Sequence, residues 1–135
     1  MQPQFLLIDD NRDGRSIIAR AIQRKYLEAS LYAFAAFSAA APTLQEIEAD
    51  PGRWIIVTGQ TAEHDPVALV AAVRAAHPRV PIIALGRNNA TAALAAGATH
   101  FLEYEAWLLL GVMIERVVAS WNPTDGTTAA RKLAP

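Results

Sequence analysis

Five short runs of apolar residues recur along the chain, and polar or glycine-containing segments separate them. They occupy residues 5–8, 31–34, 54–58, 81–85 and 100–102. Continuous apolar runs of this length are typical of strands that are buried on both faces of a parallel sheet. We therefore predict five strands, with the run at residues 54–58, which ends on a threonine, at the centre of the sheet.

Between these runs, apolar residues recur at the three- and four-residue spacing of amphipathic helices. Helices are predicted from Arg12 to about Leu27, from Pro42 to about Asp50, from Pro66 through Arg74, and at residues 91–96 and 106–121. Either Asn11 or Asp10 can cap the first helix, and Asp65 followed by Pro66 is a cap with a first-turn proline. Strands that alternate with helices imply right-handed crossovers and a doubly wound α/β fold with a five-stranded parallel sheet.

The predicted helix at residues 106–121 is apolar around most of its circumference, which is more than a helix covering one side of a sheet requires. The residues at the spacing that would face the sheet are Leu110, Ile114 and Val117. On that arrangement Leu109 and Met113 point away from the sheet. An exposed apolar stripe indicates an interface, and we assign it to Trp107, Leu109 and Met113. The alternative is that these side chains fill an internal gap.

Length and composition restrict the function classes. The chain has 135 residues, of which 53% are hydrophobic and 19% charged, with a net charge of -1. We expect one globular domain at residues 1–121, followed by a linker or disordered tail at residues 122–135. The absence of a basic stripe argues against direct binding of nucleic acid. No apolar run approaches the ~18 residues of a membrane span, and no signal peptide is recognisable, so a cytoplasmic location is expected.

The residue types that support catalysis or metal binding are sparse. There is no cysteine, which excludes disulfides, thiol chemistry and cysteine-based zinc sites. The three histidines, His64, His77 and His100, are not spaced as metal-ligand pairs. No serine lies in a nucleophile-elbow context, and no glycine-rich phosphate loop is present. We therefore expect no enzymatic activity, no catalytic residue and no cofactor.

Polar residues follow several of the predicted strands, and ligands of such sheets bind at the carboxyl ends of the strands. Asp9 and Asp10 follow the first strand. Two carboxylates without a third bind a hard cation such as Mg²⁺ poorly, so we expect no metal, although a weak Mg²⁺ site at this pair stays open. The alternative is that one acid caps the first helix and the other is solvated.

Over about residues 4–120 the chain resembles the receiver domain of bacterial two-component response regulators. The resemblance rests on the run Leu-Leu-Ile-Asp-Asp-Asn at residues 6–11, on Pro-Ile-Ile-Ala-Leu at residues 81–85, and on Ala-Gly-Ala at residues 96–98 followed by Phe101 and Leu102. It implies a flavodoxin-like topology. The connection from Gly86 to Gly97 looks shorter than in that family, which implies a shortened fourth helix.

The resemblance also implies a phosphorylation site, and most of its parts are missing here. Receivers accept a phosphoryl group on an aspartate at the end of the third strand, where this chain has Thr58. The family's hydroxyl residue after the fourth strand corresponds to Gly86, and its lysine after the fifth strand corresponds to Tyr104. Only the acidic pair, Asp9 and Asp10, matches. A threonine hydroxyl is neutral, poorly nucleophilic without a base, and a weak metal ligand.

Two further positions follow from the resemblance. Glu63 or Asp65 could supply the missing acceptor on another alignment, but Asp65 is better explained as a helix cap. Phe101 stands where receivers carry an aromatic switch residue. Without an acceptor to respond to, we expect Phe101 to pack in a single conformation.

The function predicted from the sequence is that of a pseudo-receiver. It would not be phosphorylated on aspartate and would act by protein association through its last helix, either with a partner protein or as a homodimer. By resemblance, it would regulate an attached or partner output module that controls transcription. The alternative is a regulatory domain that senses a small ligand in the crevice near Thr58, Gly86 and Tyr104.

Overall fold

The computed structural model describes residues 3–49 and 51–121, and this part of the chain contains one parallel sheet. Its strands are β1 (Gln4–Ile8), β2 (Leu31–Phe34), β3 (Trp54–Thr58), β4 (Ile82–Gly86) and β5 (His100–Glu103). They pair in the order β2-β1-β3-β4-β5, so β3 is central. The doubly wound five-stranded sheet predicted from the sequence is confirmed. The predicted tail at residues 122–135 lies outside the described residues.

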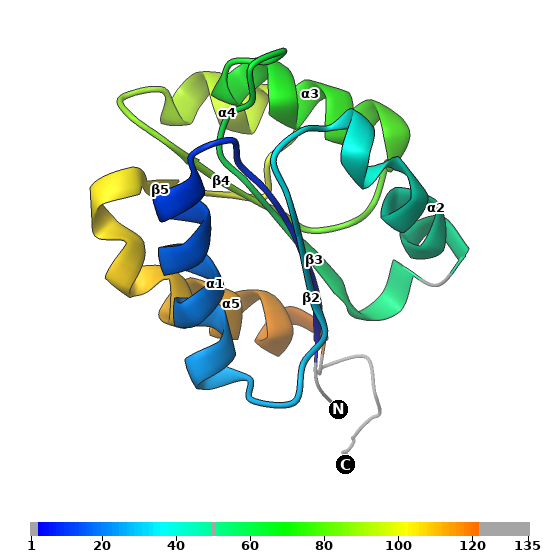
Figure 1. The fold of residues 1–135 in the computed structure, drawn as a ribbon, viewed down its shortest axis with the longest axis vertical. Helices are drawn as coiled ribbons and strands as arrows, with labels where there is room; N and C mark the ends of the chain where they lie inside the picture. Colours follow the sequence, from blue (N-terminus) through cyan, green and yellow to red (C-terminus); the bar gives the residue numbers. More distant parts are fainter. Residues whose placement is uncertain (1–2, 50, 122–135) are drawn as a thin grey trace.

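Helices cover both faces of the sheet. They are α1 (Arg12–Lys25), α2 (Ala41–Ala49), α3 (Pro66–Ala76), α4 (Ala90–Ala96) and α5 (Leu110–Trp121), with 3₁₀ segments η1 (Ser38–Ala40), η2 (Pro51–Arg53) and η3 (Tyr104–Leu109). Helices α1 and α5 pack on one face, and α2, α3 and α4 pack on the other (Figure 1). None of the helices in the described ranges is long and apolar enough to cross a bilayer.

Side chains of the central strand alternate between the two faces of the sheet. Ile56 packs toward α2 and α3, whereas Ile55 and Val57 pack toward α1 and α5. Every residue of β3 is buried. Because helices cover both faces, apolar residues are favoured at each position of an inner strand. This explains why the strands appear in the sequence as continuous apolar runs.

The helix caps are those predicted from the sequence. The side chain of Asn11 accepts a hydrogen bond from the Gly14 amide at 2.8 Å, and α1 begins after it. Asp65 accepts a hydrogen bond from the Ala68 amide at 2.8 Å, which confirms it as the cap of α3. Helix α4 is short, as predicted, and it ends at Gly97.

The predicted helix at residues 106–121 is wrong in its first turn. A 3₁₀ helix, η3, precedes α5, and Ala106 inside it has the non-helical angles φ -94° and ψ 25°. The apolar residues that lead into α5 fit either helix type, so their pattern did not separate the two. Within α5 the prediction is confirmed, because the residues buried against the sheet are Leu110, Ile114 and Val117.

Smaller differences concern element boundaries. Helix α1 ends at Lys25 and not at Leu27, because Tyr26 already has non-helical angles. Helix α2 begins one residue before Pro42. Gly86, which was expected to follow the fourth strand, is the last residue of β4 and pairs with Glu103. These shifts leave the strand ends, and therefore the site described below, at the predicted edge of the sheet.

Candidate functional site

The four strand ends singled out by the sequence lie at one edge of the sheet. Asp9 follows β1, Thr58 ends β3, Gly86 ends β4 and Tyr104 follows β5. Because the strands are parallel, their carboxyl ends share this edge. The side chains of Asp9 and Tyr104 are in contact there, although 95 positions separate them in the sequence.

Asp9 is a fully buried carboxylate, with 0% of its surface exposed. The Tyr104 hydroxyl donates a hydrogen bond to its Oδ2 at 2.9 Å, and the Asn11 amide donates to its Oδ1 at 3.0 Å. The Arg15 guanidinium donates to the backbone carbonyl of Asp9 at 2.7 Å and not to its carboxylate. Both carboxylate oxygens of Asp9 are therefore engaged by donors from within the chain.

The protonation equilibria of this pair follow from its burial. Burial raises the pKa of Asp9 above its usual value, while the hydrogen bonds from Asn11 and Tyr104 offset part of that effect. Burial, followed by the hydrogen bond to Asp9, raises the pKa of Tyr104 well above its usual range. Tyr104 therefore keeps its proton and acts as a hydrogen-bond donor at every ordinary pH.

The sequence left open that one of the two acids, Asp9 or Asp10, caps α1, and in the structure neither of them does. Asn11 is the cap, because its side chain accepts the Gly14 amide. Asp10 has an exposed side chain, while Asp9 is buried among other groups of the chain. The described residues contain no group of three or more histidine, cysteine, aspartate or glutamate side chains that could hold a metal ion.

Thr58 ends β3 at the same edge of the sheet and is also fully buried, at 0% exposure. Its hydroxyl has no hydrogen-bond partner among the described residues. A threonine hydroxyl becomes a useful nucleophile only when a neighbouring base accepts its proton. No such base contacts Thr58 in the part of the chain that the structure describes.

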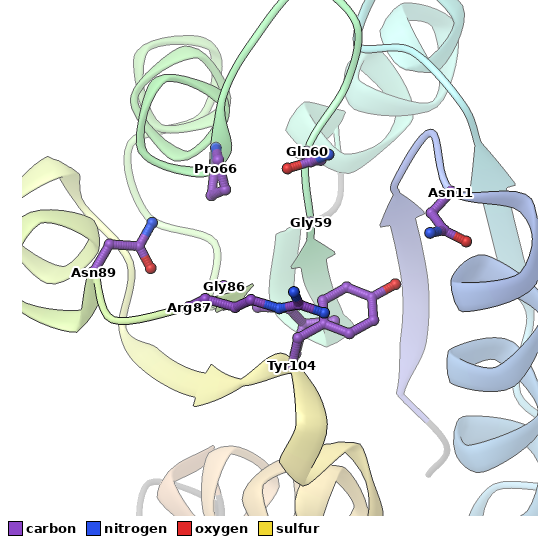
Figure 2. Close-up of a pocket in the computed structure, with 9 residues that line it drawn as sticks. Asn11, Gly59, Gln60, Pro66, Gly86, Arg87, Asn89 and Tyr104 are labelled. Carbon is purple, nitrogen blue, oxygen red and sulfur yellow. The ribbon is translucent and has the colours of Figure 1, made fainter.

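A cavity of about 470 Å³ opens at the same edge. Its polar lining comes from Asn11, Gln60, Arg87, Asn89 and Tyr104. In Figure 2 the Tyr104 ring extends from the end of β5 toward the α1 side, where Asn11 lies, while Asn89 lies on the α4 side. Gly86 and Tyr104, two of the three residues near which the sequence suggested ligand binding, line this cavity, whereas Thr58 does not.

Two glycines leave room for these side chains. A Cβ atom on Gly59 would collide with the carboxylate of Asp9, and one on Gly14 would collide with the Tyr104 hydroxyl. Neither contact was predicted from the sequence. A signal was present, because glycine in the first turns of a helix lowers helix stability and suggests a packing requirement.

Of the remaining predicted positions, Phe101 adjoins the cavity, because a Cβ atom on the lining residue Gly86 would come within 3.2 Å of the Phe101 ring. Phe101 is half-buried and packs against the core on the α2–α4 face. His64 packs its ring edge-on against Phe37, with 5.8 Å between ring centroids. His77 is buried, and His100 contacts Thr99 at 3.3 Å.

The predicted interface residues divide between surface and core. Leu109 is 56% exposed, whereas Trp107 and Met113 are half-buried and pack against the core. Met113 therefore does not share the outward orientation of Leu109. The four-residue spacing between them predicts a common face only within one α-helix, and Leu109 belongs to η3 whereas Met113 belongs to α5. Leu108 and Val112, which were not predicted to belong to the interface, are 75% and 49% exposed.

Asp9→Asn is expected to stabilise the chain above neutral pH by about 1 kcal/mol. The raised pKa means that folded Asp9 holds its proton to higher pH than unfolded Asp9. Its contribution to stability is thus full below the unfolded pKa and is lost as the pH rises through the folded pKa. Asparagine is neutral and can still accept from the Asn11 amide, so the gain should shrink toward pH 4. Urea unfolding from pH 4 to pH 8 measures the difference, with the exposed Asp10→Asn as control. A loss of stability in Asp9→Asn at pH 8 would contradict this account.

No protein-family model matches the chain, and no curated protein sequence matches it. Solved structures do match. The signal receiver domain of a DNA-binding response regulator from Colwellia psychrerythraea 34H superposes with a TM-score of 0.72 at 15% identity, over 87% of this chain and 99% of that one. The non-phosphorylated receiver domain of the stress response regulator RcsB from Escherichia coli gives 0.70 at 15% identity, over 89% and 95%.

A third structure belongs to a longer protein, a probable two-component system response regulator/GGDEF domain protein. It superposes with a TM-score of 0.67 at 22% identity, over 89% of this chain and 50% of that one. This chain thus spans half the length of that protein. The agreement among these structures concerns the order and packing of strands and helices. The chain therefore has the fold of the receiver domains of response regulators.

Proposed function

We propose that this chain is a receiver-like signalling domain that works without aspartyl phosphorylation and acts through protein association. The observation that carries the proposal is the hydrogen bond from Tyr104 to Asp9, at the edge of the sheet where the buried Thr58 ends β3. A phosphoryl acceptor must present a nucleophile, and Thr58 presents a buried neutral hydroxyl with no base in contact. Mg²⁺ is usually bound through one or two carboxylates together with waters, and both carboxylate oxygens of Asp9 already accept hydrogen bonds from within the chain.

Association is supported by the apolar groups that the last two elements expose. Leu108, Leu109 and Val112 are all at least 49% exposed, and they lie on η3 and on the first turn of α5. Exposed apolar side chains that gather in this way usually mark an interface. In this proposal they pair with a second copy or with a partner protein.

The output that the domain would regulate is inferred from its structural neighbours. One neighbour is the receiver domain of a DNA-binding response regulator, and another is half of a response regulator/GGDEF domain protein. By analogy, we assign this chain to the control of an attached or partner output module, with transcription as the process that is regulated. The analogy rests on fold alone, so the site residues and not the neighbours carry the mechanism.

Incubation with acetyl phosphate and Mg²⁺, followed by intact mass measurement, tests the absence of phosphorylation. We expect the mass of the chain to stay unchanged, because Thr58 is buried and Asp9 is occupied by Tyr104. A phosphorylatable receiver domain treated in parallel shows that the reagent is active. A stable phosphoryl adduct on this chain would overturn the proposal.

Light scattering tests the association. We expect a dimer that Leu109→Asp converts to a monomer, because a carboxylate at an apolar contact must be desolvated without a partner. Leu27→Asp is the matched control, since Leu27 is 83% exposed and follows the end of α1. A monomer for the unmodified chain would remove the homodimer from the proposal.

The cavity at the strand ends supports a second candidate function, the sensing of a small ligand. Its volume of about 470 Å³ lies within the range of ~300–1,000 Å³ typical of ligand pockets. Asn11, Gln60, Arg87 and Asn89 offer hydrogen-bond donors to a polar ligand. Thermal-shift measurements with nucleotides and polar metabolites, beside Arg87→Ala, test this function. The absence of any shift, or a shift of equal size in Arg87→Ala, would count against it.

A further inference from the structure

A second concave surface lies between α1 and η3, and it shares no lining residue with the cavity at the strand ends. It consists of hollows of about 470 Å³ and about 130 Å³, which adjoin because Ala21, Arg24 and Trp107 line both. We call the two together the α1–η3 groove. The side chains that line it include those of Ile17, Arg20, Ala21, Arg24, Trp107 and Leu108.

The apolar part of the α1–η3 groove remains in contact with water. Leu108 is 75% exposed and Ile17 is 41% exposed, while Trp107 between them is half-buried. Covering such groups is favourable by about 25 cal/mol for each Å² of apolar surface removed from water. The groove therefore favours an occupant that brings apolar side chains of its own.

The rim of the α1–η3 groove is positively charged. Arg20 and Arg24 are exposed, and neither forms an ion pair with another group in residues 3–49 or 51–121. At one end Lys25 is already bound to Glu115 at 2.9 Å. No acidic residue is among those that line the groove. Two guanidinium groups are therefore available beside an apolar floor.

We propose that the α1–η3 groove binds an amphipathic helix of a partner protein whose apolar stripe is flanked by acidic side chains. A helix that lays its apolar face into a groove uses anchors at every third and fourth position, and its flanking carboxylates would reach Arg20 and Arg24. This inference rests on the proposed function, because it names the kind of partner with which the domain associates.

Other occupants fit this surface less well. A second copy that presented the same surface would bring Arg20 and Arg24 toward their own counterparts, and like charges at an interface are unfavourable. A membrane surface needs apolar groups that protrude, whereas this surface is concave. Of the three residues assigned above to association, Leu109 and Val112 do not line the groove, whereas Leu108 belongs to both surfaces. Variants of Arg20 and Arg24 therefore test the groove alone, and Leu109→Asp tests the other surface alone.

The test uses the full chain and three synthetic helical peptides. The first carries leucine at every third and fourth position with flanking glutamates, the second has lysine in place of each glutamate, and the third has serine in place of each leucine in the acidic peptide. Fluorescence anisotropy of the labelled peptides measures the dissociation constants. We expect the acidic leucine peptide to bind about tenfold more tightly than the lysine peptide, and the serine peptide not to bind.

Charge reversal on the rim distinguishes the groove from other surfaces. Arg20→Glu combined with Arg24→Glu should weaken the acidic peptide about fivefold and strengthen the lysine peptide, because two exposed ion pairs become two repulsions. Leu108→Ser should weaken both peptides. Arg79→Glu, which changes an exposed arginine outside the groove, should change neither.

Each remaining outcome overturns the proposal. Equal binding of the acidic and lysine peptides, no binding of either, or binding that the rim variants leave unchanged would show that the groove does not select an acidic helix. Binding of the chain to anionic lipid vesicles that Leu108→Ser abolishes would identify a membrane as the occupant instead. The acetyl phosphate and light-scattering results do not depend on the groove, so a failure here is separable from a failure of the proposed function.

Discussion

Gly14→Ala is expected to destabilise this chain by about 1–3 kcal/mol, although alanine normally stabilises a helix relative to glycine. Gly14 is the third residue of α1, and a Cβ atom there would overlap the Tyr104 hydroxyl. The phenol would have to move, and its hydrogen bond to Asp9 would be lost. The buried carboxylate of Asp9 would then keep only one donor, the Asn11 amide, and an unsatisfied buried acceptor costs about 1–3 kcal/mol.

The sign of the Gly14→Ala effect should reverse when Tyr104 is truncated. In a Tyr104→Ala background nothing opposes the new methyl group, and alanine should gain up to about 1 kcal/mol of helix propensity. Urea unfolding of the two single variants, the double variant and the unmodified chain gives the coupling free energy. Gly111→Ala in α5 is the matched control, because its Cβ would meet only the flexible side chain of Lys25. An equal effect of Gly14→Ala in both backgrounds would show that the phenol does not occupy this position.

The fold was predictable because its determinants are local. Each interior strand contains a continuous apolar run, because both of its faces are covered. Asn11 and Asp65 mark the starts of α1 and α3. The boundary of α5 was not predictable, because the apolar residues before Leu110 satisfy a 3₁₀ helix and an α-helix equally. Local patterns therefore identified the elements but not the point where η3 ends.

The candidate site was predictable in its location but not in its contacts. The parallel sheet requires that Asp9, Thr58 and Tyr104 lie at one edge. The hydrogen bond between Asp9 and Tyr104 depends on side-chain directions and on the space above Gly14, and no spacing in the sequence encodes these. For this reason Tyr104 was predicted only as a degenerate position, whereas the structure gives it a definite partner.

Arg74→Met is expected to destabilise the chain by about 2–4 kcal/mol, because it removes the link between α3 and the turn before β5. The Arg74 guanidinium donates to the Gly97 carbonyl from Nε at 3.0 Å and from Nη2 at 2.7 Å. Its Nη1 donates to the His77 carbonyl at 3.1 Å. Hydrogen bonds donated by a charged group are among the stronger ones. Methionine retains most of the apolar contact that the aliphatic part of the Arg74 side chain makes.

Gly97 explains why this link should matter to the site. Gly97 has a φ of 125°, a conformation that other residues rarely adopt. A Cβ atom on Gly97 would lie only 2.7 Å from the Cγ atom of Arg74. The turn that Arg74 stabilises leads directly into β5, which ends beside Tyr104. Loosening this turn should therefore also weaken the hydrogen bond between Tyr104 and Asp9.

Two measurements separate this local effect of Arg74→Met from a general loss of stability. Urea unfolding should show the loss in Arg74→Met and less than about 0.5 kcal/mol in Arg79→Met, which removes an exposed arginine. Amide hydrogen exchange should accelerate most at Ala98 and Thr99, whose amides bond to the Ala93 and Ile82 carbonyls. Arg74→Lys should be more stable than Arg74→Met but less stable than the unmodified chain. An ammonium group cannot donate two parallel hydrogen bonds to the Gly97 carbonyl and also reach the His77 carbonyl. Uniform acceleration of exchange throughout the sheet would show that Arg74 does not act on this turn in particular, and the proposed connection from α3 to the Tyr104 position would then be wrong.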